Sequence, residues 1–346
     1  MRNDFGVDQA DGLRRLLVSN QTRVITLVAG KSGVGRTSTT INLAAALARS
    51  GKDVLVLDEN DVPGSVLDRL GFHAKHDLLD VVKGRCSICE AMQSTGGYSV
   101  LSTARTMSAM ATSRTYEGRA SDSARLDQAG QLRLEGALTE AGSGVDVMLV
   151  DAAMPVPSRI EGQAGSAAAL SAAKASGDKP FAGVSNSCYT VSSSLARGTA
   201  LLVVVDATAS GITESYALIK RLALENARLQ FEIVVNKVAD EQAARTVFEN
   251  MAILARRNLA ARLEYVGCIP LDDRLKRAMQ LGKSVVEAFP TSISAQSYMG
   301  LAQKLLLMPV RQDEAEGGVS TVIRNLMKHA SQTQQRLSRE IAQVVN

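Results

Sequence analysis

The sequence predicts an α/β protein with a doubly wound, mainly parallel sheet and helices on both of its faces. Short apolar runs alternate with helical patterns from residue 23 onward, which is the order of elements in such folds. Most of these runs are apolar without interruption, as expected for parallel strands covered on both faces. A glycine-rich stretch follows the first run, at a turn where such sheets commonly bind phosphate groups.

The apolar runs place the expected strands at residues 23–29, 53–58, 97–103, 145–151, 200–206, 231–237 and 263–269. Helices are expected at 37–50, 214–226 and 241–263, where apolar residues recur at helical spacing. Two stretches interrupt this alternation, because residues 104–123 are polar and residues 152–198 are rich in Ala, Ser and Gly. We interpret them as surface insertions near 104–123 and 156–196.

The composition is that of an ordinary globular protein, with 346 residues of which 45% are hydrophobic and 21% are charged. Aromatic residues make up only 3% and Trp is absent, which disfavours base-stacking platforms. The net charge of +4 is too mild to indicate nucleic acid. There is no apolar run of about 18 residues and no apolar signal core, so we expect a cytoplasmic protein. The Cys86–Cys89 pair lacks the partners of a zinc site, so reduced thiols are expected.

The stretch "VAGKSGVGRTSTT", residues 28–40, joins the first expected strand to the first expected helix. Gly30, Gly35 and Thr37 occupy positions of the phosphate-binding pattern G-x-x-x-x-G-K-[ST]. Glycines let backbone N–H groups approach phosphates closely, and the helix N-terminus adds its dipole. The lysine of the pattern is Arg36, while a lysine stands earlier, at Lys31. The alternative is a glycine-rich turn without a ligand.

The loop "GKSGVGRTS" resembles the deviant loop of the MinD/ParA ATPases, K-G-G-x-G-K-[ST], whose early lysine matches Lys31. The resemblance implies a P-loop NTPase fold of the SIMIBI, MinD-like class, with ATP and Mg²⁺ as ligands. It also implies an ATP-dependent homodimer in which Lys31 reaches the nucleotide of the partner.

Four further segments resemble the same family. "GKDVLVLDEN" resembles its second strand and switch I, and "VDVMLVDAAMP" its Walker B strand and switch II. "FEIVVNKV" resembles the strand whose asparagine reads adenine, which is Asn236 here, and "VGCIPLDDRLKRAM" resembles the purine wall, with Pro270 against the base.

The resemblance implies a set of site residues. The catalytic candidates are Lys31, Asp58, Asn60 and Asp151. The nucleotide-binding candidates are Gly30, Lys31, Ser32, Gly33, Val34, Gly35, Arg36, Thr37, Ser38, Asn236 and Pro270. Thr37 would bind Mg²⁺ directly, and Asp58 and Asp151 would act on it through water. An acid directly after a buried parallel strand favours this role over a simple loop cap, because ligands bind at the carboxyl edge of such sheets.

Three departures from the family pattern bear on hydrolysis. Arg36 replaces the compact ammonium of lysine with a larger, planar guanidinium. A guanidinium can bind phosphate oxygens, but it changes the geometry of the loop around the phosphates. Asn60 replaces the second aspartate of D-x-D, which orients the attacking water in MinD-type enzymes, and an amide has no general-base capacity. Asp61 could take its place only if the loop shifts by one residue. After Asp151, "AAMP" lacks the switch II glycine. We therefore expect ATP binding with slow, partner-dependent or absent hydrolysis.

The N-terminal segment "DQADGLRRLL" resembles the D-Q-A-x-x-L-R motif of the FlhG/FleN group, MinD-like ATPases that control flagellar number and placement. The matching residues are Asp8, Gln9, Ala10, Leu13 and Arg14. The resemblance implies a helix within residues 1–20 that activates an SRP-type GTPase, FlhF. The alternative is an exposed amphipathic helix without a partner.

The tail, residues 311–346, is expected to contain a linker and an amphipathic helix. Val319, Val322, Ile323, Leu326 and Met327 follow helical spacing. MinD-type regulators commonly end in a helix that binds anionic membrane, and the pattern fits such a helix and one packed on the core equally well. The nucleotide-binding domain is then expected at 21–310, and a peripheral position at the inner membrane or cell pole is compatible with the tail.

The leading functional hypothesis is a MinD-like, ATP-gated regulator of flagellar number, placement and assembly. Its expected partners are a second copy, an SRP-type GTPase and flagellar basal-body proteins. One alternative is a ParA-like DNA or plasmid partitioning ATPase, but the small net charge gives little support for DNA as a partner. Another is a pseudo-ATPase scaffold that does not hydrolyse ATP.

Overall fold

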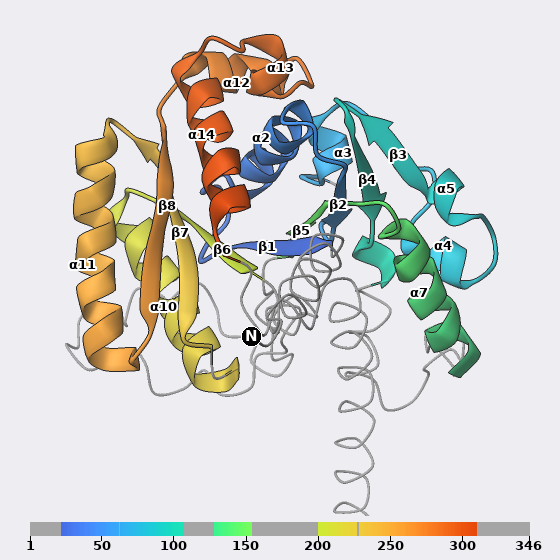
Figure 1. The fold of residues 1–346 in the computed structure, drawn as a ribbon, viewed down its shortest axis with the longest axis horizontal. Helices are drawn as coiled ribbons and strands as arrows, with labels where there is room; N and C mark the ends of the chain where they lie inside the picture. Colours follow the sequence, from blue (N-terminus) through green and yellow to red (C-terminus); the bar gives the residue numbers. More distant parts are fainter. Residues whose placement is uncertain (1–21, 62, 107–127, 154–199, 227, 310–346) are drawn as a thin grey trace, which may run out of the picture.

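The computed structural model describes residues 22–61, 63–106, 128–153, 200–226 and 228–309. The matching residues of the N-terminal motif, most of both predicted insertions and the predicted C-terminal helix lie outside the described residues, and their boundaries stay predictions. The described residues form one eight-stranded sheet in the order β3-β4-β2-β5-β1-β6-β7-β8 (Figure 1). The β3–β4 pair is antiparallel and the other neighbours are parallel.

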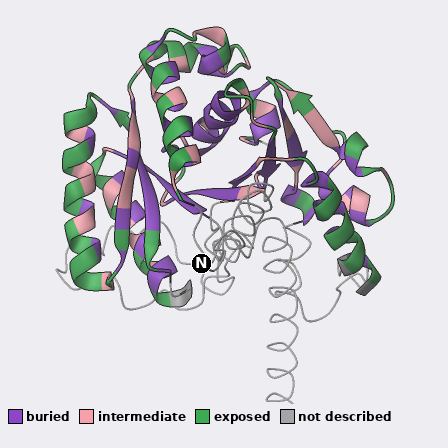
Figure 2. Cartoon of the chain, viewed as in Figure 1, coloured by how far each residue is buried: buried purple, intermediate pink, exposed green. Residues whose placement is uncertain are grey.

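Seven of the eight strands lie where the apolar runs predict them, with ends that differ by no more than about two residues, and β3 is the exception. The eight strands are β1 Arg23–Ala29, β2 Val54–Asp58, β3 Met92–Thr95, β4 Tyr98–Ser102, β5 Val147–Asp151, β6 Ala200–Asp206, β7 Gln230–Val238 and β8 Arg262–Pro270. Every residue of β2, β5 and β6 is buried (Figure 2). The doubly wound parallel sheet is therefore confirmed.

Strand β3 was not among the expected strands. It is a short edge strand of sequence MQST with no apolar run, joined to β4 by Gly96 and Gly97. Both glycines have positive φ, 55° and 84°. A two-residue hairpin turn whose central residues both have positive φ matches the twist of the strands, and glycine adopts it without strain. The Gly-Gly pair was thus the signal for this hairpin.

The helices cover both faces of the sheet (Figure 1). They are α2 Arg36–Arg49, α3 Val66–Arg69, α4 Leu78–Val82, α5 Ile88–Ala91, α7 Gln128–Ala141, α10 Ala209–Asn226, α11 Glu241–Leu259, α12 Asp273–Gln280, α13 Val285–Ala288 and α14 Ile293–Leu307. Helices α2, α3, α12, α13 and α14 share one hydrophobic cluster. On the opposite face, α4, α5 and α7 form a second cluster and α10 and α11 a third.

Helix α2 sits in the centre of the first cluster. Ala44, Ala45 and Ala46 are buried with Ile41 and Leu47, and their small side chains let the helix lie closely between the sheet and α14. Burial of α2 fixes the position of its N-terminus, where the glycine-rich loop ends.

Helix α11 ends before the predicted residue 263. Ala260 takes a left-handed conformation with φ 50°, which stops the helix. The next residues pair with the sheet, where Arg262 aligns with Gln230 of β7. Among the described helices, none is both long and apolar enough to cross a membrane.

Candidate functional site

The glycine-rich loop runs from the end of β1 to the start of α2, at the carboxyl edge of the parallel strands. Gly33 and Gly35 have positive φ, 79° and 97°. A Cβ on Gly35 would lie 2.3 Å from the side-chain nitrogen of Asn236, and one on Gly30 would lie 2.3 Å from the backbone of Glu214. Backbone or buried side-chain atoms at that distance cannot move aside cheaply, so the loop needs glycine at positions 30 and 35. Ser32 and Gly33 form its exposed tip.

The carboxylate of Asp151, the last residue of β5, accepts hydrogen bonds from three side chains near the start of α2. Thr37 Oγ1 donates to Oδ2 at 2.8 Å, and Thr40 Oγ1 donates to Oδ1 at 3.0 Å. Arg36 Nε donates to Oδ1 at 2.8 Å in a buried ion pair. The contacts arise because β5 is the neighbour of β1, with Leu27 aligned to Asp151. Thr40 was missed from sequence, although its position three residues after Thr37 places it on the same helix face.

Asn60 joins switch I to the end of β5. Its Nδ2 donates to Asp58 Oδ1 at 3.1 Å, to Asp151 Oδ2 at 2.9 Å and to the Asp151 carbonyl at 3.0 Å. Its Oδ1 accepts from Arg36 Nη2 at 2.5 Å. Asp61 is exposed, so the loop is not shifted in the way that would let Asp61 take the place of Asn60.

Asp58 and Asp151 are aligned residues of the neighbouring strands β2 and β5. Burial, followed by the charge of Asp151, raises the pKa of Asp58 from 3.8 to about 7, although hydrogen bonds from Asn60 and Val66 partly oppose this shift. Two buried carboxylates side by side repel each other unless a cation or a proton lies between them. This edge of the sheet therefore favours positive charge.

The donor set fits Mg²⁺ held together with phosphates. Mg²⁺ prefers oxygen ligands and is usually bound through one or two carboxylates, water and substrate phosphate. The Thr37 hydroxyl, Asp58 and Asp151 supply such oxygens. No group of three or more His, Cys, Asp or Glu side chains that could hold a metal occurs among the described residues. A metal here would thus depend on oxygens from a bound phosphate.

Lys31 lies against the end of β6 in its own chain. Its Nζ donates to Ser210 Oγ at 2.7 Å and to Thr208 Oγ1 at 3.3 Å, and lies 3.7 Å from Asp206 Oδ2. Its side chain is 29% exposed. Asp206 was missed from sequence, although it follows a buried strand as Asp58 and Asp151 do.

A cavity of about 660 Å³ opens beside the loop, between β7 and α12. Asn236 and Pro270, the two predicted adenine contacts, both line it, together with Gly35 and Ser38 of the loop. Asn236 Nδ2 also donates to the carbonyl of Val34 at 2.8 Å. The cavity is therefore continuous with the loop, as a site for a base and its phosphates requires.

Glu59 ties switch I to the start of switch II. It is 4% exposed, and its Oε2 accepts from the Ala153 N–H at 2.9 Å while its own N–H donates to the Asp151 carbonyl at 3.2 Å. Nothing in the sequence pattern pointed to Glu59, because its role depends on contacts with residues that follow β5 much later in the chain.

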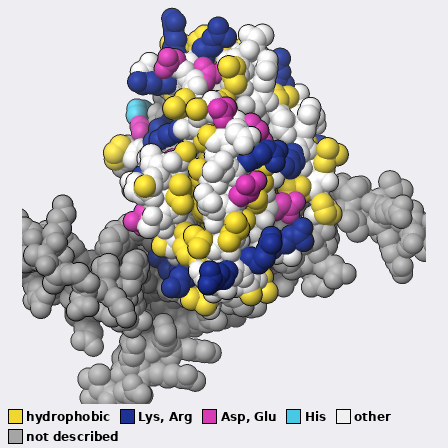
Figure 3. Space-filling model, turned by 90° about the vertical axis from the view of Figure 1, so that its left-hand side faces the viewer, with side chains coloured by type: hydrophobic (Ala, Val, Ile, Leu, Met, Phe, Trp, Pro, Cys, Tyr) yellow, Lys and Arg dark blue, Asp and Glu magenta, His cyan; other side chains and the backbone are white. Residues whose placement is uncertain are grey.

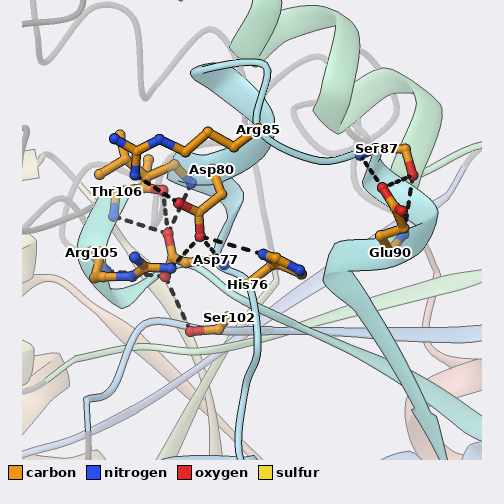
Figure 4. Close-up of polar contacts among 10 residues, drawn as sticks. His76, Asp77, Asp80, Arg85, Ser87, Glu90, Ser102, Arg105 and Thr106 are labelled. Carbon is orange, nitrogen blue, oxygen red and sulfur yellow. Dashed lines mark hydrogen bonds and ion pairs between the residues drawn. The ribbon is translucent and has the colours of Figure 1, made fainter.

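A second polar cluster surrounds Asp77 and Asp80 near the end of β4 (Figure 4). The Asp77 carboxylate accepts from Ser102 Oγ at 3.1 Å and from Thr106 Oγ1 at 2.9 Å. Burial raises the pKa of Asp80, but hydrogen bonds from the Asp77 N–H and from Arg105 hold it below its ordinary value.

These contacts fix the position of residues 102–106. Within this segment, Thr103 donates two hydrogen bonds to the Asp58 carbonyl, one from its N–H at 2.8 Å and one from its hydroxyl at 3.1 Å. Asp77 and Asp80 cap the N-terminus of α4, and Asp80 forms ion pairs with Arg85 and Arg105. The cluster therefore has a structural role.

Residues 25–285 match the family described as the CobQ/CobB/MinD/ParA nucleotide binding domain. The chain belongs to this family. The resemblance to MinD/ParA ATPases is thus confirmed, and so is their fold.

Among relatives, the antiactivator FleN of Pseudomonas aeruginosa is 29% identical over 308 residues, which cover 89% of this chain and 94% of FleN. The solved structure of the cell division protein MinD of Aquifex aeolicus has a TM-score of 0.52 at 21% identity, covering 84% of this chain and 100% of MinD. The septum site-determining protein MinD of Pyrococcus horikoshii, solved with Mg-ADP, has a TM-score of 0.50 at 19% identity, covering 82% and 96%. At these identities the solved structures support the MinD/ParA fold alone.

The structure brings the predicted catalytic residues of this MinD/ParA-family chain to one edge of the sheet, where Asn60 contacts both Asp58 and Asp151 and Lys31 of the loop lies against the end of β6. Their roles in binding and catalysis stay predictions. The predicted partner-binding residues, from Asp8 to Arg14, lie outside the described part of the chain.

Proposed function

We propose that the chain is an ATP-binding regulator of the MinD type that controls flagellar number and placement. The observation that carries the nucleotide part is the meeting of the loop, Asp151 and the Asn236 cavity at one sheet edge. The flagellar part rests on the likeness to FleN, which extends over 89% of this chain and is not confined to the loop.

In this proposal each group of residues has a separate task. The base occupies the cavity beside Asn236 and Pro270, and the backbone N–H groups of the loop bind the phosphates. Thr37, with Asp58 and Asp151, holds the Mg²⁺, which neutralises phosphate charge when bound. Lys31 serves the dimer by reaching the nucleotide of a second copy.

Hydrolysis is slow in this proposal because position 60, where the family pattern has an aspartate, carries no base. Position 60 carries an amide whose nitrogen donates to both carboxylates, and an amide does not accept a proton from water. Turnover then depends on a partner, or the chain acts through ATP binding alone.

The proposed partners are a second copy, basal-body proteins and an SRP-type GTPase that binds through Asp8, Gln9, Ala10, Leu13 and Arg14. Residues 311–346 are proposed to hold the protein at the inner membrane or the cell pole. DNA is not a proposed partner, and the charges on the α11 side of the molecule are mixed in sign (Figure 3).

Calorimetric titration with Mg²⁺ and ATP tests the nucleotide part. We expect the wild type to bind and Gly35→Ala to lose binding, because its Cβ would meet Asn236. Gly136→Ala is the matched control, since a Cβ there meets nothing within 4 Å. A wild type that does not bind ATP would overturn the proposal.

Counting flagella per cell tests the biological part. We expect abnormal numbers when the gene is replaced by an allele encoding Gly35→Ala or lacking residues 1–20, and normal numbers with Gly136→Ala. Normal flagellation together with a plasmid or chromosome segregation defect would instead support the ParA-like alternative.

A further inference from the structure

The two departures from the family pattern at positions 36 and 60 touch each other. Arg36 Nη2 donates to Asn60 Oδ1 at 2.5 Å, and Arg36 Nε donates to Asp151 Oδ1 at 2.8 Å. Asn60 Nδ2 donates to Asp151 Oδ2 at 2.9 Å. The three side chains form a closed ring, so the residue at position 36 is matched to the residue at position 60.

An arginine suits this ring better than a lysine. The guanidinium offers several donors in a fixed plane, so it bonds Asp151 and Asn60 at once in different directions. A lysine carries its charge on a single nitrogen without this fork. The Arg36 and Asp151 side chains are only 9% and 0% exposed, and removing one partner of a buried pair leaves an uncompensated charge.

An asparagine also suits the ring better than an aspartate. The Asn60 amide donates to oxygens of both Asp58 and Asp151 while its carbonyl oxygen accepts from Arg36. An aspartate at this place would point a third carboxylate at the other two, and like charges at such distances repel unless a further cation joins them.

We propose that Arg36 and Asn60 act as a coupled pair that serves as the internal counter-ion of the Asp58–Asp151 carboxylates. The guanidinium supplies positive charge at the carboxylates that a divalent ion would otherwise neutralise, and the amide supplies the donors that hold switch I against β5. The proposal rests on the proposed function in one respect, because bound phosphates then compete with Asp151 for the same guanidinium.

Thermal unfolding of the nucleotide-free protein tests the counter-ion role. We expect MgCl₂ to leave the midpoint of the wild type unchanged relative to NaCl of equal ionic strength. Arg36→Gln should have a lower midpoint, and MgCl₂ alone should raise it, because the two carboxylates have lost their cation. Arg49→Gln, in the last turn of the same helix, controls for loss of an arginine and should show no response to Mg²⁺. A wild type that responds as strongly as Arg36→Gln would overturn the proposal.

A double-mutant cycle tests the coupling and does not depend on Arg36→Gln being folded. We expect Arg36→Lys to lower the midpoint when Asn60 is present and to have a smaller effect in an Asn60→Ala background, where the partner is already lost. The matched pair Arg49→Lys and Asn60→Ala should be additive, because these residues share no contact. Equal effects of Arg36→Lys in both backgrounds would show that positions 36 and 60 are independent, which would sink the inference.

Neither experiment contains a nucleotide, so their failure is distinguishable from failure of the proposed function. If the unfolding results agree with these expectations but the wild type does not bind ATP in calorimetry, the counter-ion pair stands and the ATP-dependent regulator is refuted. If the wild type binds ATP but the Arg36 variants show neither the response to MgCl₂ nor the coupling to position 60, the proposed regulator stands and the counter-ion pair is refuted.

Discussion

Lys31 is held by Asp206 of its own chain, with Nζ 3.7 Å from Oδ2 and a 2.7 Å hydrogen bond to the nearby Ser210. A lysine that reaches the nucleotide of a second copy must first leave these partners. In the proposed ATP-bound dimer, breaking these contacts in each subunit would therefore oppose association.

Weakening this contact should favour the dimer. Asp206→Asn removes the charge that attracts Lys31, and a partly exposed ion pair of this kind contributes about 0.2–1 kcal/mol. Because each subunit of the dimer carries one such pair, we expect the dissociation constant of the ATP-bound dimer to fall by up to about 30-fold. Sedimentation with a non-hydrolysable ATP analogue measures it. Asp53→Asn, an exposed acid at another sheet edge, is the control, and an unchanged dimer constant in Asp206→Asn would contradict the prediction.

Stability should depend on pH through Asp58. Because the folded protein raises the pKa of this group from 3.8 to about 7, the folded state binds more protons than the unfolded state between these values. The free energy of unfolding should therefore fall as pH rises from about 4 to about 7, by at most about 1.4 kcal/mol per unit. Above pH 7 this contribution levels off.

Urea unfolding across that range, in the wild type and in Asp58→Asn, isolates the contribution. The variant cannot ionise at position 58, so its slope should be shallower than that of the wild type. Parallel curves for the two proteins would show that Asp58 does not titrate in this window.

Hydrolysis should respond to positions 36 and 60 together. Asn60→Asp alone places a third carboxylate beside Asp58 and Asp151, whereas Arg36→Lys with Asn60→Asp restores both elements of the family pattern. We expect the double variant to hydrolyse ATP faster than the wild type, by up to about 10²-fold if a base is regained. A steady-state phosphate-release assay decides the matter, and rapid turnover by the wild type itself would refute the view that the site is impaired.

Gly30 should tolerate no side chain. Gly30→Ala would bring its Cβ within 2.3 Å of the backbone at Glu214 and Ser215, and forcing α10 away costs about 1–3 kcal/mol. Gly300→Ala, within α14 and with nothing within 4 Å, should instead be neutral or stabilising by up to about 1 kcal/mol. Denaturant midpoints compare the two. A Gly30→Ala protein as stable as the wild type would show that α10 moves freely.

The sequence was sufficient for seven of the eight strands and for two of the acids at the carboxyl edge of the sheet. Buried strands need continuous apolar residues, and an acid that follows such a strand stands out, which is why Asp58 and Asp151 were found. The hairpin strand β3 carries no apolar run, and α7 lay between an interpreted insertion and a strand without a strong apolar stripe. Such elements are fixed by what they pack against.

The side-chain contacts within the site were harder to predict from the sequence than the identities of its residues. The meeting of Arg36 with Asn60 depends on the direction of two side chains, one at the start of α2 and the other two residues after β2. Glu59 accepts a hydrogen bond from the Ala153 N–H, a contact between two segments that are 94 residues apart in the sequence. Asp206 ends a buried strand, as Asp58 does. It was not predicted as a site residue because it does not belong to the family pattern.

The alignment of Asp58 with Asp151 also bears on how β2 and β5 find their pairing. Both strands are buried on both faces, so sliding one past the other by a residue would still bury aliphatic side chains on each side. The slide would, however, break the hydrogen bonds by which Asn60, two residues after β2, donates to the carbonyl and the carboxylate of Asp151 at the end of β5, and it would leave that buried carboxylate with fewer partners. The residues that we assign to nucleotide chemistry thereby also select the correct strand alignment during folding.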